Sequence, residues 1–242
     1  ISRNRFLTMS KFVILDRDGV INRVTRGQYI TSPEMIELLP GAADAVARLN
    51  AAGYSIIVVS NQQCVALGLL TSEGLDLVSE LLRVMLLGKG ARIEAFFYCT
   101  HLKTVACECR KPQPGLLLEA QRRFGFDLAS TYFVGDMYSD MMTAKNAGCR
   151  SIFTLGGLDD ELHRRGEPFP HPPEYISRDL ADAAATEREA AEMLKESGNA
   201  KEAEALEQRA ADLGNQAMLQ NAFGEHYLQD AYAGGHLVNK TK

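Results

Sequence analysis

Short apolar runs, rich in β-branched and aromatic residues, recur along the first three quarters of the chain and alternate with amphipathic stretches. Runs of this kind are typical of buried strands. They lie at residues 12–15, 55–59, 95–98, 131–134 and 151–155, with a shorter one at 175–176. The stretches between them predict helices near residues 41–52, 72–87, 115–124 and 138–147, and a further helix from about residue 180.

The alternation of strands and helices indicates how the chain is layered. Strands that are apolar along both faces need cover on both sides, as in a parallel sheet between two layers of helices. Glycine falls just beyond three of the predicted helix ends, at Gly53, Gly125 and Gly148, where a left-handed cap favours it. The pattern therefore predicts an α/β fold with a doubly wound parallel sheet of the Rossmann type.

The remaining segments differ in composition. Residues 156–175 are rich in glycine, proline and histidine, and they predict a loop. Residues 181–213 consist mainly of Ala, Glu, Lys, Arg and Leu, which predicts one or two amphipathic helices broken at residues 197–199. A single helical hairpin of the tetratricopeptide type is an alternative for this segment. Because residues 1–8 precede Met9, we interpret them as an expression remnant or an alternative leader. The expected division is a leader at 1–9, an α/β domain at 10–187 and a helical extension at 188–242.

Composition excludes several classes of protein. The chain has 242 residues, of which 46% are hydrophobic and 24% charged, as in ordinary soluble globular proteins. It contains no run of eighteen apolar residues that would predict a membrane span. Its net charge of −5 gives no electrostatic basis for binding nucleic acid. Because no export signal is recognisable at the start, we expect a cytoplasmic protein.

Polar residues suited to phosphate chemistry follow three of the predicted strands. They are Asp16-Arg17-Asp18-Gly19 after the first strand, Ser60-Asn61-Gln62 after the second, and Gly135-Asp136 after the fourth. Arg110-Lys111-Pro112 precedes one of the helices. Each motif alone is as typical of a turn or a helix cap as it is of a binding site. Open parallel sheets bind ligands at the carboxyl ends of their strands, so we expect these motifs to meet in one crevice.

The residue types match the hydrolysis of a phosphate monoester, which needs an in-line nucleophile, a proton donor and neutralisation of charge. Asp16 is the predicted nucleophile and would form an aspartyl-phosphate. Asp18 is the predicted acid and base. Mg²⁺ prefers oxygen ligands, and we expect it to be held by Asp16, the backbone carbonyl of Asp18 and Asp136.

A second group of residues is expected to bind the phosphate oxygens. These are Ser60, Asn61, Gln62, Arg110 and Lys111, with the two cations offsetting the negative charge. Asp140 is expected to orient Lys111 or the waters on the metal. A carboxylate in the first turn of a helix is an equally good interpretation of Asp140.

Three of the five cysteines crowd around one histidine. Cys99, His101, Cys107 and Cys109 offer four soft ligands for tetrahedral Zn²⁺. With no position left for water, such a site would be structural. A chance cluster of buried cysteines is the alternative, but the intervening stretch is polar. Cys64 and Cys149 are interpreted as small buried side chains.

These motifs resemble those of the haloacid dehalogenase superfamily of phosphatases. The similarity covers about residues 10–180 and rests on four motifs in order, at Asp16-x-Asp18-Gly19-Val20-Ile21-Asn22, Ser60, Lys111 and Gly135-Asp136-x-x-x-Asp140. It implies a phosphatase that uses Mg²⁺ and an aspartyl-phosphate intermediate. Because no large cap domain fits between the motifs, we expect an open crevice and a small or extended substrate.

The zinc-ligand segment, followed by Arg110-Lys111-Pro112-Gln113-Pro114-Gly115, resembles that of the D-glycero-D-manno-heptose 1,7-bisphosphate 7-phosphatases. The resemblance implies a small phosphorylated sugar as substrate. The chain departs from this family's pattern at Leu67, where an arginine is usual, and at Met137, where a basic residue is usual. A bisphosphate needs a second anion-binding group. Arg23 and Arg26 could supply one, although we interpret both as side chains of a solvated loop.

Several alternatives stay open. Histidinol-phosphatases share the zinc loop, and polynucleotide 3′-phosphatases share the catalytic core, although the acidic charge disfavours nucleic acid. In a scaffold protein the helical extension would be the working part and would mediate self-association or partner binding. Within that extension, His226, Asp230 and His236 weakly resemble the zinc-ligand helix of bacterial phospholipase C-like enzymes. We favour a docking helix there, because two or three ligands do not close a zinc site.

Overall fold

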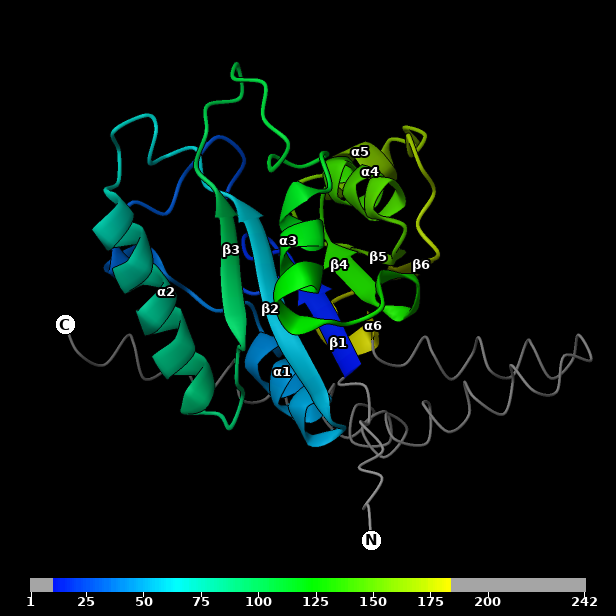
Figure 1. Ribbon diagram of the computed structural model, residues 1–242, viewed down its shortest axis with the longest axis horizontal. Coiled ribbons are helices and arrows are strands. Elements are labelled where there is room, and N and C mark those ends of the chain that lie inside the picture. Colours follow the sequence, from blue (N-terminus) through cyan, green and yellow to red (C-terminus); the bar gives the residue numbers. More distant parts are fainter. Residues whose placement is uncertain (1–10, 184–242) are drawn as a thin grey trace, which may run out of the picture.

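The computed structural model describes residues 11–183, which form one α/β unit (Figure 1). The predicted leader and the helical extension at 188–242, with His226, Asp230 and His236, lie outside the described residues. The expectations for those segments therefore stay predictions.

A six-stranded sheet forms the centre of the molecule. Its strands are β1 (Lys11–Leu15), β2 (Tyr54–Asn61), β3 (Ala95–Cys99), β4 (Tyr132–Gly135), β5 (Arg150–Thr154) and β6 (Tyr175–Ser177). The spatial order is β3-β2-β1-β4-β5-β6, and every neighbouring pair is parallel. The order reverses between β1 and β4, and ligands of doubly wound sheets bind at such a switch point.

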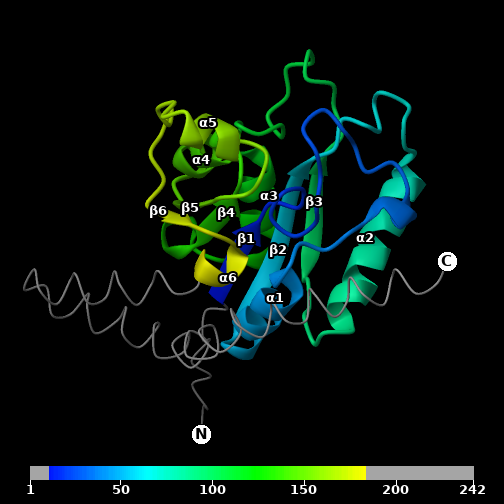
Figure 2. The same cartoon turned by 180° about the vertical axis from the view of Figure 1, so that it is seen from behind.

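Helices cover both faces of the sheet. One face carries α1 (Ala42–Ala51), α2 (Ser72–Leu87) and α6 (Leu180–Ala183), and the other carries α3 (Gly115–Phe124) and α4 (Tyr138–Ala147). Figure 1 looks onto the α3 and α4 layer, and Figure 2 onto the layer of α1 and α6. The doubly wound parallel sheet predicted from the sequence is confirmed.

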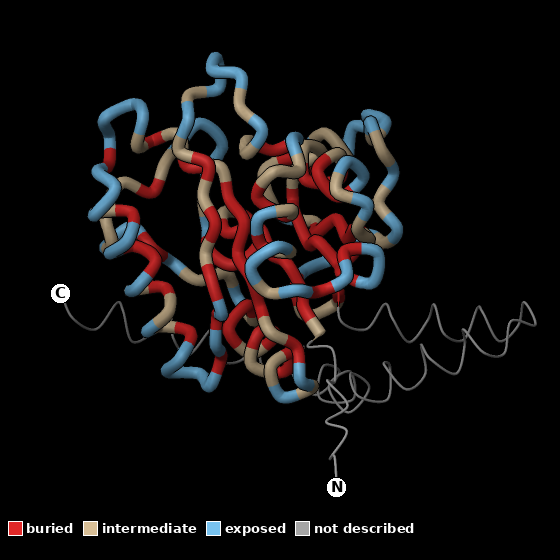
Figure 3. Tube along the Cα trace, in the orientation of Figure 1, coloured by how far each residue is buried: buried red, intermediate tan, exposed pale blue. Residues whose placement is uncertain are grey.

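The central strand shows why apolar runs without alternation become parallel strands. Val13 and Leu15 of β1 pack into the core beneath α1 and α2, whereas Phe12 and Ile14 pack into the core beneath α3. Both faces of the sheet are therefore buried, and the strands form the most buried layer of the molecule (Figure 3). The left-handed glycines predicted at Gly125 and Gly148 are confirmed, with φ of 70° and 72°.

The prediction of an unbroken loop at residues 156–175 was wrong, because it contains the short helix α5 (Asp160–Arg164). Five helical residues are too few to give a readable periodicity. The segment is anchored by Phe169, whose ring lies 4.4 Å from that of Tyr138 and 5.0 Å from that of Phe153. Two 3₁₀ turns, η1 (Pro33–Met35) and η2 (Leu128–Ser130), complete the regular structure.

No separate domain is inserted between the elements of residues 11–183, in agreement with the expected absence of a large cap. The longest connection, residues 16–41 between β1 and α1, folds back on itself through bridges from Asn22 to Asp18 and to Leu38. No helix within this part of the chain is both long and apolar enough to cross a membrane.

Candidate active site

Three buried carboxylates meet at the switch point of the sheet. Asp16 follows β1, Asp136 follows β4, and Asp140 lies in the first turn of α4. Their oxygen atoms lie within 4.8 Å of one another, and the side chains are almost or completely buried. The convergence of the β1 and β4 motifs predicted from strand order is therefore observed.

Glycine backbones make room for Asp136. A Cβ atom added at Gly19 would lie 2.1 Å from Asp136 Oδ2, and one at Gly157 would lie 2.2 Å from Asp136 Cβ. Gly19 also adopts a φ of +88°, which other residues rarely tolerate. Larger residues at either position would displace the carboxylate, so the close approach requires both glycines.

Lys111 holds two of the carboxylates together. Its Nζ lies 2.7 Å from Asp16 Oδ2 and 2.7 Å from Asp140 Oδ1, and its side chain is 2% exposed. Asp140 Oδ2 in turn accepts the backbone N–H of Met137 at 3.0 Å. Both interpretations of Asp140 are thus observed, since it orients Lys111 and also caps the first turn of its helix.

The charges of this cluster do not balance, because three carboxylates surround one ammonium group. Burial raises the pKa of Asp140 to about 6, against the opposing effect of Lys111. Burial together with Asp16 and Asp140 holds the pKa of Asp136 well above its ordinary value. Burial alone would lower the pKa of Lys111, but Asp140 and Asp16 keep it above the ordinary value.

The free acceptor at this cluster belongs to Asp136. Its Oδ2 accepts the backbone N–H of Leu158 at 2.5 Å, whereas its buried Oδ1 has no hydrogen-bond partner among the described residues. A buried oxygen without a donor beside an excess of negative charge fits a hard divalent cation such as Mg²⁺. The residues present are therefore suited to hold that ion.

Asp18 is enclosed by donors. Its carboxylate accepts bonds from Nε and Nη2 of Arg17 at 2.9–3.1 Å, from Nδ2 of Asn22 at 2.9 Å and from Nε2 of Gln62 at 2.7 Å. Its side chain is 18% exposed, unlike that of buried Asp16. The predicted acid and base is therefore fixed in orientation while it keeps access to the crevice.

The three residues predicted to bind phosphate after β2 have different surroundings. Asn61 accepts the backbone N–H of Lys111 at 3.0 Å and donates to the Lys111 carbonyl at 3.2 Å. The buried amide of Gln62 donates to Asp18 and, at 3.1 Å, to the hydroxyl of Ser60. Asn61 therefore positions Lys111, and Gln62 positions Asp18. Ser60 accepts a bond from Gln62, so its own hydroxyl hydrogen can still be donated to a phosphate.

Sequence reasoning assigned no role to Arg17. Its guanidinium is fully buried, ion-paired with Asp18, and lies 5.8 Å from the ring centre of Tyr98. The Tyr98 hydroxyl contacts that of Ser79 at 2.8 Å, which ties this arrangement to α2. Arg17 lies between the two aspartates that are predicted to be catalytic, but the sequence does not indicate that its side chain points inward.

The cysteine cluster after β3 has the dimensions of a tetrahedral metal site. The Sγ atom of Cys107 lies 3.8 Å from that of Cys99 and 3.6 Å from that of Cys109. The Nδ1 atom of His101 lies 3.6 Å from the sulfur of Cys99 and 3.2 Å from the sulfur of Cys109. Zn–S bonds of about 2.3 Å at tetrahedral angles require sulfur atoms about 3.8 Å apart. The four side chains could therefore hold Zn²⁺. Of the other two cysteines, Cys64 is buried as expected and Cys149 is only half-buried.

Arg110 lies on the zinc-loop side of the site. It is half-buried, and its Nη1 donates to the carbonyl of His101 at 3.2 Å. Leu67, in the loop after β2, is 47% exposed. Among the arginines after β1, Arg23 forms an exposed ion pair with Glu37, whereas Arg26 contacts the buried Asp159. Arg26 is exposed, as expected of a solvated loop, and in addition contacts Asp159, which lies 133 positions further along the chain.

Comparison with known proteins agrees with this geometry. The HAD-hydrolase-like family model matches residues 108–183. The D-glycero-beta-D-manno-heptose-1,7-bisphosphate 7-phosphatase of Bordetella bronchiseptica is 37% identical over 160 residues, covering 62% of this chain and 89% of that protein. The corresponding alpha-anomer phosphatase of Mycobacterium bovis is 39% identical over 150 residues, covering 60% and 79%.

Solved structures of related phosphatases have a similar fold. The D,D-heptose 1,7-bisphosphate phosphatase of B. bronchiseptica, complexed with magnesium and phosphate, superimposes with a TM-score of 0.67 at 31% identity, covering 77% of this chain and 99% of that chain. A HAD-like phosphatase from Mesorhizobium loti gives a TM-score of 0.56 at 30% identity and covers 64% and 77%.

Proposed function

Since this chain belongs to the haloacid dehalogenase superfamily of phosphatases, in the family of the D-glycero-D-manno-heptose 1,7-bisphosphate 7-phosphatases, we propose that it is a Mg²⁺-dependent phosphomonoesterase that removes one phosphate from a heptose bisphosphate. The observation that carries the mechanism is the buried group of Asp16, Asp136 and Asp140 around Lys111, with the unpaired Asp136 Oδ1.

In the first step a carboxylate oxygen of Asp16 attacks phosphorus, and the bond from phosphorus to the sugar oxygen breaks. Asp18 gives its proton to the departing oxygen. In the second step water attacks the aspartyl-phosphate, Asp18 takes a proton from that water, and inorganic phosphate leaves with Asp16 regenerated. Asp18 serves both steps because Arg17, Asn22 and Gln62 hold its carboxylate in one orientation.

Charge on the phosphoryl oxygens is offset by Lys111 and by the Ser60 hydroxyl. Asp16, the Asp18 carbonyl and Asp136 would hold Mg²⁺, which when bound neutralises the charge that develops on the phosphoryl group. Because Lys111 bridges Asp16 and Asp140, it also keeps the nucleophile oriented. Asn61 supports this by holding the Lys111 backbone at both its N–H and its carbonyl.

The cysteine cluster is proposed to be a structural zinc site. Four ligand atoms within 4.8 Å of one another leave no position for water, so the ion would not take part in the reaction. Cys109 directly precedes Arg110 and Lys111, and the carbonyl of Glu108 accepts the Gly115 N–H at 2.9 Å. A metal here would fix the loop that presents both cations to the substrate.

The proposal is tested by steady-state assays of the full chain with and without Mg²⁺. The substrates are heptose 1,7-bisphosphate, histidinol phosphate, a 3′-phosphorylated oligonucleotide and p-nitrophenyl phosphate. We expect Mg²⁺-dependent release of one phosphate, with the highest kcat/KM for the heptose bisphosphate. Higher efficiency with histidinol phosphate or the oligonucleotide would replace the substrate. An absence of turnover on all four, with Asp16→Asn as the blank, would refute the enzymatic function and favour a scaffold.

A further inference from the structure

The chain that follows β5 wraps around Asp136, which is proposed to hold Mg²⁺. We call residues 156–169, which include α5, the β5 segment. Gly157 leaves room for the Asp136 side chain, since a Cβ atom there would lie 2.2 Å from it. The Leu158 N–H donates to Asp136 Oδ2 at 2.5 Å, and the Asp159 N–H donates to the Asp136 carbonyl at 3.3 Å. Three consecutive residues therefore determine where this carboxylate lies.

The bond from Leu158 determines which oxygen of Asp136 is available to a cation. Oδ2 is occupied by the Leu158 N–H, whereas the buried Oδ1 has no hydrogen-bond partner among residues 11–183. Groups that hydrogen-bond a metal ligand fix its orientation, and their loss costs about 10- to 100-fold in metal affinity or activity. The position of Leu158 therefore bears directly on the proposed Mg²⁺ site.

Asp159 holds Leu158 in this position. Its side chain is 6% exposed, and its Oδ2 accepts the backbone N–H of Tyr138 at 2.8 Å. Its Oδ1 pairs with Nη2 of Arg26, and the same Nη2 donates to the Leu158 carbonyl. Leu158 is thus held at its carbonyl while its N–H points to Asp136.

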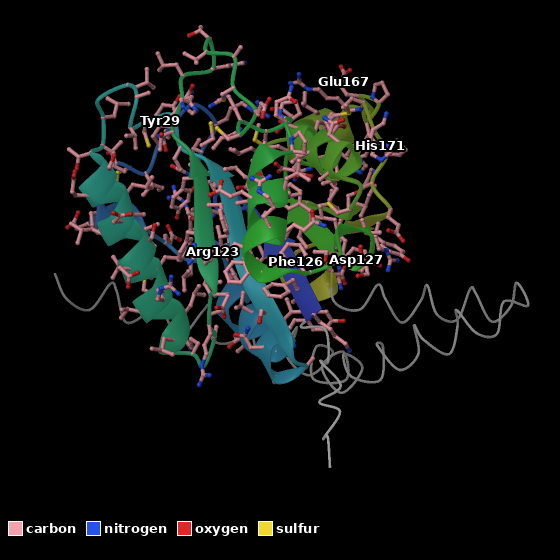
Figure 4. All side chains as sticks on the ribbon, viewed as in Figure 1. Tyr29, Arg123, Phe126, Asp127, Glu167 and His171 are labelled. Carbon is pink, nitrogen blue, oxygen red and sulfur yellow. The ribbon has the colours of Figure 1, made fainter. Side chains whose placement is uncertain are left out.

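The rest of the β5 segment is attached to α4 by separate contacts. The Tyr138 hydroxyl donates to the Glu167 carbonyl at 2.7 Å, and the Tyr138 ring lies 4.4 Å from that of Phe169. Figure 4 labels Glu167 near α4 and α5, at the carboxyl end of the sheet. Loss of the Asp159 carboxylate should therefore release Leu158 without detaching the whole segment.

The next residue, Asp160, is a matched comparison. Its side chain is 9% exposed, and it pairs with Arg164 one turn further along α5. That ion pair stays within α5 and does not involve Asp136. Of these two adjacent buried carboxylates, Asp159 is the one whose partner also holds Leu158.

We propose that Asp159 is a positioning residue for the cation site: together with Arg26 it holds Leu158 so that Asp136 presents Oδ1 to Mg²⁺. Both oxygens of Asp159 are engaged, by Tyr138 and by Arg26, so it acts through Asp136 and not as a ligand. The proposal rests on the proposed Mg²⁺-dependent function, and it gives the ion pair between Asp159 and Arg26 a task in assembling the metal site.

The test measures binding of Mn²⁺ to the full chain, without substrate, from the loss of the free-ion signal in electron paramagnetic resonance. Mn²⁺ prefers the same octahedral oxygen coordination as Mg²⁺. In Asp159→Ala we expect the dissociation constant to rise about 10- to 100-fold. Asp159→Asn keeps an oxygen for the Tyr138 N–H and should lose less. The matched control, Asp160→Asn, should bind as wild type does.

Arg26→Gln separates positioning from simple charge. Removing a cation near the site would strengthen Mn²⁺ binding if the ion pair acted only through its charge. If Arg26 holds Leu158, the same change weakens binding, which is the result we expect. Tighter binding in Arg26→Gln, unchanged binding in Asp159→Ala, or equal losses in Asp159→Asn and Asp160→Asn would overturn the proposal. If circular dichroism shows that Asp159→Ala does not fold, the other three variants decide the outcome.

Mg²⁺ activation of phosphate release from p-nitrophenyl phosphate gives a second readout. The Mg²⁺ concentration for half-maximal activity should rise in Asp159→Ala by a factor similar to that for Mn²⁺, with kcat at saturating Mg²⁺ little changed. If no phosphate ester is hydrolysed but Mn²⁺ binding depends on Asp159, the proposed function fails and the positioning role stands. If turnover requires Mg²⁺ but Asp159→Ala binds Mn²⁺ as wild type does, the role of Asp159 fails and the proposed function stands. A wild type that binds no Mn²⁺ would refute both.

Discussion

Without Mg²⁺ the folded protein should lose stability as the pH rises from weakly acidic to neutral. The cause is Asp140, whose pKa is raised to about 6 in the folded chain, chiefly by burial, from an ordinary 3.8. Below pH 3.8 the group is protonated in both folded and unfolded chains and has no effect. Between the two values only the unfolded chain releases the proton, so unfolding becomes more favourable as the pH rises.

The magnitude follows from the shift of about two pKa units, at 1.36 kcal/mol per unit. The free energy of unfolding should fall by about 3 kcal/mol in all, and about half of this decrease lies between pH 5 and pH 7.5. Asp136 shifts in the same direction and adds to the decrease. Saturating Mg²⁺ should flatten the profile, because the cation then takes the place of the protons.

The assay is urea denaturation followed by circular dichroism, since the chain has no tryptophan. Mg²⁺ is removed by gel filtration and not by a chelator, so that any zinc stays bound. The variant is Asp140→Asn, and the control is Asp76→Asn at an exposed carboxylate on α2. The difference in the free energy of unfolding between wild type and Asp140→Asn should change by roughly 1.4 kcal/mol between pH 5 and pH 7.5. A difference that stays constant over this range would refute the account of Asp140.

Three further outcomes are expected. Purified protein should contain about one zinc per chain, and protein without zinc would refute the site. Cys107→Ser should lower the melting temperature by roughly 5 °C or more, whereas the control Cys149→Ser should not. Asp16→Asn should reduce turnover by several orders of magnitude without unfolding the chain, and rapid-quench labelling should place the phosphoryl group on Asp16; label on Asp18 or Ser60 would overturn the assignment. A chain that ends after Thr186 should keep phosphatase activity, because every proposed catalytic residue lies within residues 11–183. If the shortened chain folds but is inactive, the extension at 188–242 contributes to the site.

The convergence of the catalytic residues could be predicted from the sequence because it depends on strand order alone. Parallel strands end at one edge of the sheet, so the residues that follow β1, β2 and β4 are brought together independently of their side-chain conformations. Residue type then limits the chemistry, since carboxylates beside a lysine suit phosphoryl transfer and Mg²⁺. The carboxylates proposed to hold Mg²⁺ and the four residues proposed to hold Zn²⁺ could be predicted from residue type in this way.

The partners of individual side chains could not be predicted in this way. In a turn, consecutive residues point in directions that the local sequence does not determine. Asn61 and Gln62 follow Ser60 directly, yet their amides bind the Lys111 backbone and the Asp18 carboxylate. Arg26 contacts Asp159 because the loop after β1 and the segment after β5 are adjacent in space, and hydrophobic periodicity carries no information over such a separation.

These unpredicted contacts hold the charged residues of the site in place. Lys111 is fixed from one side by Asn61 and from the other by the loop that carries the cysteine cluster, so in the proposed reaction the phosphate would meet a rigid set of charges. Such rigidity suits charge stabilisation, which depends on preorganised groups. Arg26, in the exposed loop after β1, contacts the Leu158 carbonyl and Asp159 through a single nitrogen. Because no cap is inserted within residues 11–183, substrate preference in the proposed reaction would depend on the loops at the carboxyl edge of the sheet.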